Sequence, residues 1–155
     1  MKLTATEEEA MRKVADHALE LHRQGKDIVF TAAIVKDGRI VVQARNEVGD
    51  TNDVSRHAEV VAMAQAADIL GTRDLSGCTL LASCQPCEMC LSAMRWAQID
   101  RVVFGAQQQN TDEAFFRFPQ LRIADFHRAC GGAFDWQGGV EEARLAHIYA
   151  PGAAE

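Results

Sequence analysis

The chain has 155 residues and a mass of 17.0 kDa, which suits one domain, and its hydrophobic content of 48% can fill a core. Its apolar runs are far shorter than the roughly 20 residues that a membrane-spanning helix needs. Residues 1–9 are polar and acidic, unlike a secretion signal. We therefore expect a single cytoplasmic domain over residues 1–155, with no membrane partner.

Charge and cysteine content narrow the class of protein further. The formal net charge is -6 and the sequence pI is about 5.3, so the chain has no overall basic field that would attract a polyanion. A nucleic-acid partner is therefore disfavoured. The five cysteines are an odd number, and in a cytoplasmic protein they favour free thiols and metal binding over a disulfide framework.

The first part of the chain predicts a helix followed by a hairpin. Thr6 and Glu9 have the spacing of a capping box, and apolar residues then recur at helical spacing until Gly25. Two β-rich runs follow at residues 28–35 and 39–44. They are joined by an Asp-Gly pair, which is typical of a tight antiparallel turn.

The rest of the chain alternates helices and strands. Ser55 is the expected N-cap of one helix, and Pro86 suits the start of another because proline near the first helical position loses no hydrogen bond. The pattern predicts a three-layer α/β/α domain around a mixed sheet of about five strands. The expected elements are a loop over 46–53, helices over 56–70, 87–97, 119–130 and 140–149, and strands over 78–83, 101–105 and 133–136.

One histidine and two cysteines form the main candidate site. His57, Cys87 and Cys90 make three zinc ligands and leave a fourth position for water, as in catalytic zinc sites. Both ligand groups lie near expected helix N-termini, where negative charge is favoured. Cys84 also forms a Cys-x-x-Cys pair with Cys87, but at a strand end we expect it outside the ligand set. Cys78 and Cys130 are expected as packing residues.

Glu59 gives the site a catalytic character. A structural zinc site needs no carboxylate two residues from its histidine, whereas a hydrolytic site uses one to move protons between water and substrate. His-x-Glu followed by Pro-Cys-x-x-Cys is the signature of zinc nucleobase deaminases. The simpler interpretation is that Glu59 is a first-turn glutamate stabilised by the helix dipole.

These residues resemble the cytidine deaminase superfamily, and in particular the branch of bacterial guanine deaminases and tRNA adenosine deaminases. The resemblance rests on the motifs at 57–60 and 83–91 and extends over about residues 30–110. It implies a cytidine-deaminase-like fold, a Zn²⁺ cofactor, hydrolytic release of ammonia from an aminoheterocycle, and a homodimer. It also implies that Asn46, Ala58 and Trp96 contact the substrate.

The chain departs from guanine deaminases after its fourth expected strand. Guanine deaminases carry an aspartate there that helps to bind guanine, and an ungapped alignment places Phe118 or Pro119 at that position. Asp112 or Glu113 could supply the carboxylate from a shifted register. Three nearby phenylalanines suggest an aromatic wall for a planar ring, at positions 115, 116 and 118.

Three functions remain open from the sequence. The favoured one is a zinc-dependent aminohydrolase that acts on cyclic amidines, with a free nucleobase or related small aminoheterocycle and water as its substrates. A tRNA adenosine deaminase would use the same chemistry, but the acidic composition disfavours it. A non-catalytic structural zinc protein would leave Glu59 unexplained. A thioredoxin-like dithiol would leave His57 unexplained.

Overall fold

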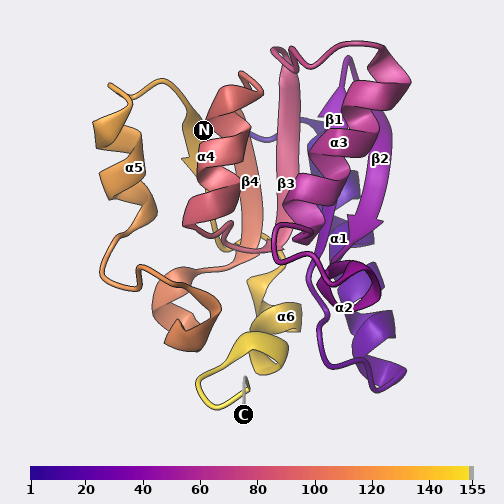
Figure 1. Cartoon of the computed structure of the whole chain (residues 1–155), viewed down its shortest axis with the longest axis vertical. Coiled ribbons are helices and arrows are strands. Elements are labelled where there is room, and N and C mark those ends of the chain that lie inside the picture. Colours follow the sequence, from indigo (N-terminus) through magenta and orange to yellow (C-terminus); the bar gives the residue numbers. More distant parts are fainter. Residues whose placement is uncertain (154–155) are drawn as a thin grey trace.

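The structure is a computed structural model that describes residues 1–153. Helices and strands alternate along most of the chain (Figure 1). In chain order they are α1 (Ala5–Arg23), β1 (Thr31–Lys36), β2 (Arg39–Arg45), α2 (Val48–Thr51), α3 (Ala58–Leu70), β3 (Cys78–Cys84), α4 (Glu88–Trp96), β4 (Arg101–Ala106), η1 (Gln108–Asn110), η2 (Glu113–Phe115), α5 (Ile123–Ala129), β5 (Asp135–Gln137) and α6 (Glu142–Tyr149).

The strands form one mixed five-stranded sheet in the order β2-β1-β3-β4-β5. β1 pairs antiparallel with β2 and with β3, whereas β3, β4 and β5 are parallel. The predicted hairpin turn is confirmed: Asp37 and Gly38 both have positive φ, at 50° and 72°, as a tight turn of this hand requires. α4 provides the crossover between β3 and β4, as expected for parallel neighbours.

Helices cover both faces of the sheet, which confirms the predicted three layers. α3 and α4 lie in front of the strands in Figure 1, with α5 beside them, and α1 lies behind. Alternation along β1 sends Ala32 and Ile34 into the core beneath α3, while Ala33 and Val35 pack against α1. α6 packs beside α1 and reaches β4 closely at Gly105, where a Cβ would lie 2.6 Å from Leu145 Cδ1.

Two predicted helix starts were wrong by two residues. The first capping box is formed by Thr4 and Glu7, not by Thr6 and Glu9. The carboxylate of Glu7 also reaches Thr79 and Arg101, and these long-range contacts select the earlier of two overlapping patterns. The N-cap of α3 is His57 rather than Ser55, whose side chain instead bonds to Asp53.

Other boundaries differ because of local turns. The expected loop over 46–53 contains the single turn α2, and the helix predicted over 119–130 is shortened to α5. α4 begins at Glu88, with Cys87 as its N-cap, and ends at Trp96. Among residues 1–153, no helix is both long and apolar enough to cross a membrane.

Candidate active site

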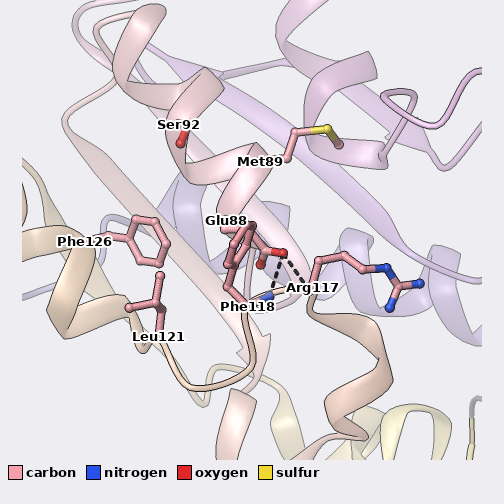
Figure 2. A pocket seen from close by; sticks show the side chains of 7 residues that line it. All are labelled: Glu88, Met89, Ser92, Arg117, Phe118, Leu121 and Phe126. Atoms are coloured by element: carbon pink, nitrogen blue, oxygen red, sulfur yellow. Dashed lines mark hydrogen bonds between the residues drawn. The ribbon is translucent and has the colours of Figure 1, made fainter.

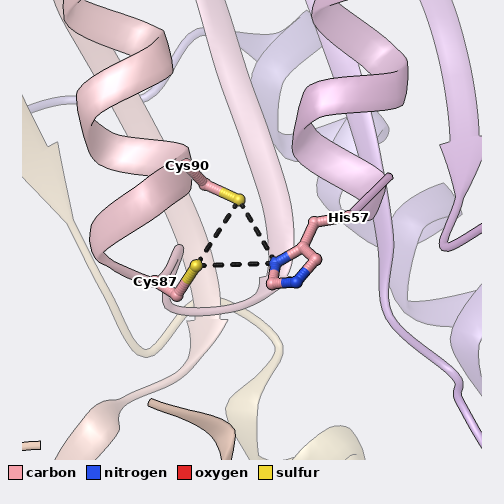
Figure 3. Close-up of side chains that lie close together, drawn as sticks. All are labelled: His57, Cys87 and Cys90. Atoms are coloured by element: carbon pink, nitrogen blue, oxygen red, sulfur yellow. Dashed lines mark hydrogen bonds between the residues drawn. The ribbon is translucent and has the colours of Figure 1, made fainter. Parts of the chain in front are cut away.

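His57, Cys87 and Cys90 converge at one point between α3 and α4 (Figure 3). The Nδ1 atom of His57 lies 3.5 Å from Cys87 Sγ and 3.6 Å from Cys90 Sγ, and the two sulfur atoms are 3.7 Å apart. Within residues 1–153, these three side chains form the one group of histidine, cysteine and acidic residues that could hold a metal ion. Cys84 lies outside it, as predicted.

The spacing of the three ligand atoms fits zinc. Tetrahedral bonds of about 2.3 Å to sulfur and about 2.0–2.1 Å to nitrogen would place the sulfurs about 3.8 Å apart and each sulfur about 3.6 Å from the nitrogen. The observed separations of 3.7, 3.5 and 3.6 Å agree with these values. Three protein ligands of this type leave one tetrahedral position for water or substrate.

Two helix N-termini position the ligands. His57 is the N-cap of α3 and Cys87 is the N-cap of α4. Cys90 lies one turn into α4, on the same face as Cys87, and is fully buried. The free N–H groups and positive dipole ends of both helices point toward this site and stabilise negative charge there.

The thiol pair carries an electrostatic conflict that a cation would remove. The hydrogen bonds from Cys90 and His57 lower the pKa of Cys87 to about 5. The neighbouring Cys87 sulfur and burial raise the pKa of Cys90 well above its usual range. Without a cation the pair therefore favours one thiolate, whereas a bound zinc ion is coordinated by two.

Glu59 lies beside the ligands but outside their group. It belongs to the first turn of α3, its side chain is 5% exposed, and it lines the cavity that His57 and Cys87 also line. Burial raises the pKa of Glu59 to about 7. A carboxyl group with such a pKa can both accept and donate a proton near neutral pH.

A cavity of about 1030 Å³ opens onto the metal ligands and Glu59. Phe30 and Tyr149 form part of its wall and stack with ring centres 5.0 Å apart. Phe115 meets both rings edge-on, at 5.1 and 6.2 Å. The predicted aromatic wall is therefore present for Phe115 and Phe116, but Phe30 and Tyr149 were missed because they come from distant parts of the chain.

A smaller groove of about 410 Å³ adjoins this cavity (Figure 2). It shares Glu88, Met89 and Arg117 with the cavity wall, and Phe118 belongs to the groove rather than to the cavity. A carboxylate oxygen of Glu88 accepts the backbone N–H groups of Arg117 and Phe118, at 2.6 and 3.2 Å. Glu88 thus ties the first turn of α4 to the segment that carries Phe115 and Phe116.

Asn46 lies at the cavity, but its one observed contact is local. It lines the cavity, and its Oδ1 atom accepts the backbone N–H of Val48 at 2.9 Å. The side chain therefore fixes the turn that leads into α2, and its NH₂ group makes no hydrogen bond among the described residues. Ala58, in the first turn of α3, is fully buried and is not among the residues that line the cavity.

Three further candidate substrate residues are likewise not brought to the cavity of this chain. Trp96 is 89% exposed at the far end of α4. Trp96 lies nine residues after Cys87, which corresponds to roughly 13 Å along the helix. Asp112 and Glu113 do not line the cavity either. The carboxylate of Asp112 instead accepts the backbone N–H groups of Ala114 and Gly152.

Comparisons with known proteins agree with this fold and site. Residues 4–106 match the model of the cytidine and deoxycytidylate deaminase zinc-binding region, and the chain therefore belongs to this family. It is 44% identical over 87 residues to guanine deaminase of Bacillus subtilis, covering 56% of each chain. It is 36% identical over 81 residues to a tRNA-specific adenosine deaminase of Agrobacterium fabrum, covering 52% of this chain and 53% of that one.

The chain spans about half the length of these two curated relatives. A solved structure from a study of A-to-I editing by tRNA:A34 deaminases superposes more completely. It covers 90% of this chain and 98% of its own, with a TM-score of 0.74 at 28% identity. The relatives thus support the fold and the zinc site, and they include proteins named for two different substrates.

Proposed function

We propose that this protein is a zinc-dependent aminohydrolase that releases ammonia from a free nucleobase or a related small aminoheterocycle. The observation that carries the proposal is the position of Glu59. It is a buried carboxyl group that lines the same cavity as His57 and Cys87 and is not needed as a ligand. A structural zinc site would gain nothing from such a group.

His57, Cys87 and Cys90 would hold the zinc ion, which when bound supplies Lewis-acid activation of a water molecule. Glu59 would accept a proton from the attacking water and give it to a ring nitrogen of the substrate. The same carboxylate would then take the proton of the newly added hydroxyl group and deliver it to the amine, which leaves as ammonia while a carbonyl group remains. A pKa raised by burial to about 7 suits a group that alternates between these two states.

The cavity wall supports a planar substrate. Phe30, Phe115 and Tyr149 present aromatic surface beside the polar groups of the site. Asn46 offers an NH₂ donor that would bind a ring nitrogen or carbonyl oxygen. This mixture of apolar walls with a few oriented polar groups is typical of sites for small heterocycles.

A tRNA adenosine deaminase is the second candidate. The structural match to a tRNA:A34 deaminase, with a TM-score of 0.74, favours it. The net charge of -6 argues against it, because phosphate contacts supply much of the affinity for nucleic acid. Salt-dependent binding of tRNA, together with inosine formation, would favour this candidate over a free base.

We also propose a homodimer. Trp96 supports it, because its side chain is 89% exposed and tryptophan is enriched at protein interfaces relative to the rest of the surface. Light scattering of the purified protein would measure its mass in solution.

The deciding experiment is an ammonia-release screen of the zinc-loaded protein against aminopurines, aminopyrimidines, their nucleosides and aminotriazines. The matched control is Glu59→Gln, which preserves the size of the side chain and all three ligands. We expect this variant to keep its zinc and to lose at least about a hundredfold in rate, since general acid-base catalysis is worth that or more. Full activity of Glu59→Gln would contradict the mechanism.

A further inference from the structure

Gln85 is a buried amide at the edge of the cavity, between the end of β3 and the start of α4. Its side chain is 7% exposed, and it lines the cavity together with Cys84 and Cys87. Its backbone N–H donates to the carbonyl oxygen of Ala106 at 2.8 Å, and this bond fixes the main chain at this point.

A second buried amide determines which way the Gln85 side chain faces. Gln108 Nε2 donates to the backbone carbonyl oxygens of Pro119 and Leu121, at 3.3 and 3.1 Å. Carbonyl oxygens can only accept, so the nitrogen of Gln108 must face them and its Oε1 must face Gln85. Gln85 Nε2 donates to that oxygen at 3.2 Å. These contacts together determine which side-chain atom is the nitrogen and which is the oxygen in both Gln85 and Gln108.

The amide oxygen of Gln85 is left facing open space. Among the described residues it has no hydrogen-bond partner. No fully buried side-chain nitrogen or oxygen within residues 1–153 lacks a partner, so this oxygen must be accessible although most of Gln85 is not. The cavity is the open space that Gln85 lines. Its wall therefore holds one oriented acceptor, Gln85 Oε1, besides the donor offered by Asn46.

We propose that Gln85 is a specificity-determining residue whose amide oxygen accepts a hydrogen bond from a ring N–H of the heterocycle. The inference rests on the proposed function and narrows its substrate class to aminoheterocycles that also carry a ring N–H, such as lactam-type or N-unsubstituted bases. A ring that presents only acceptors to Gln85 would leave the amide oxygen buried against another acceptor, which is costly.

The test measures binding in a Glu59→Gln background, so that ligands bind to the zinc-loaded protein without turnover. Calorimetry would give Kd for guanine and cytosine and for each of their single ring N-methyl derivatives. The variant is Gln85→Met, which keeps the length of the side chain but replaces the amide oxygen by a weak thioether acceptor. Zinc content and thermal unfolding show that the variant is folded.

For at least one parent base, we expect one N-methyl derivative to bind about tenfold more weakly than the parent, the usual worth of one hydrogen bond. Gln85→Met should bind the parent base about tenfold more weakly than the protein with Gln85 does. In this variant, the Kd values of the parent base and its N-methyl derivative should differ by less than about threefold. Gln108 does not line the cavity, so Gln108→Met leaves the ligand contacts unchanged. It should still reduce the difference in Kd between parent and derivative, because it removes the hydrogen bond that orients the Gln85 side chain.

An unchanged Kd of the parent base in Gln85→Met would overturn the inference, and so would failure of every parent base to bind. These outcomes are distinct from failure of the proposed function, which is measured as ammonia release by the protein with Glu59 intact. Ammonia release together with an unchanged Kd in Gln85→Met would support the deaminase activity and contradict the role of Gln85. A weaker Kd in Gln85→Met without ammonia release would support the role of Gln85 in binding and contradict the deaminase activity.

Discussion

The carboxylate of Glu88 accepts the backbone N–H of Arg117 at 2.6 Å, which joins the helix that carries two metal ligands to the segment that forms the aromatic wall (Figure 2). Phe116 lies just before this contact and packs in a buried cluster with Cys87 and Cys90. The position of the wall relative to the metal ligands therefore depends on a side chain that is itself neither ligand nor aromatic.

Replacing Glu88 tests this dependence. Glu88→Gln keeps an acceptor oxygen, and we expect its activity to stay within about twofold of the parent protein. Glu88→Leu leaves the N–H groups of Arg117 and Phe118 without this acceptor, and we expect KM to rise about tenfold while zinc content is unchanged. Steady-state kinetics and metal analysis of both variants would measure this. Equal KM values for the two variants would show that the contact does not position the wall.

The ligand set predicts which buried cysteines hold zinc. Cys90→Ser should lower zinc affinity at least about tenfold, because a neutral hydroxyl is a poor replacement for a thiolate. Cys84→Ser is the matched control, since Cys84 is also buried near the site but lies outside the ligand group. Its zinc content should remain that of the parent protein, as measured by mass spectrometry of the purified proteins. Zinc loss in Cys84→Ser alone would reverse the assignment.

The ion pair between buried Glu7 and partly buried Arg101 predicts acid sensitivity. Glu7 is 2% exposed; burial opposes its ionisation, but hydrogen bonds from Arg101, Thr4 and Thr79 together lower its pKa from 4.5 to about 2. Because the folded pKa is depressed, the stabilisation is complete above about pH 5 and is lost as the pH falls from about 4.5 toward 2.

Glu7→Gln should therefore lower the free energy of unfolding by about 1–3 kcal/mol at pH 7. It should also reduce the pH dependence of unfolding below about pH 5. Urea unfolding at several pH values would measure both effects. Glu8→Gln provides the control, because Glu8 is an exposed glutamate in the same helical turn. An identical acid response in the two variants would contradict the role of Glu7.

Tyr149 links the last helix to the aromatic wall. Its hydroxyl donates to the Val29 carbonyl oxygen at 2.9 Å and contacts the Ser83 hydroxyl at 2.8 Å, while its ring stacks on Phe30. Tyr149→Phe keeps the stack and removes these hydrogen bonds, so we expect a loss of about 1–2 kcal/mol in unfolding free energy. Tyr149→Leu should also lose substrate affinity. Thermal unfolding and substrate titration would separate the two effects.

Much of the fold was predictable because its signals are local. The continuous apolar runs of β1 and β4, the Asp37-Gly38 turn and the proline before α4 each act over a few residues. The convergence of His57, Cys87 and Cys90 was equally predictable, because each motif occupies one helix N-terminus and needs a fixed spacing to present its side chains.

The sequence by itself determined the alternation of elements, the grouping of His57, Cys87 and Cys90, and the placement of Glu59 beside them. Only the tertiary structure decided between the capping boxes at Thr4 and Thr6, since the choice depends on Arg101, which lies 94 residues after Glu7. Only the tertiary structure placed Trp96 outside the cavity and brought Phe30, Gln85 and Tyr149 into its wall. The physical reason is that contacts between distant segments depend on how the layers pack, and no local spacing encodes that packing.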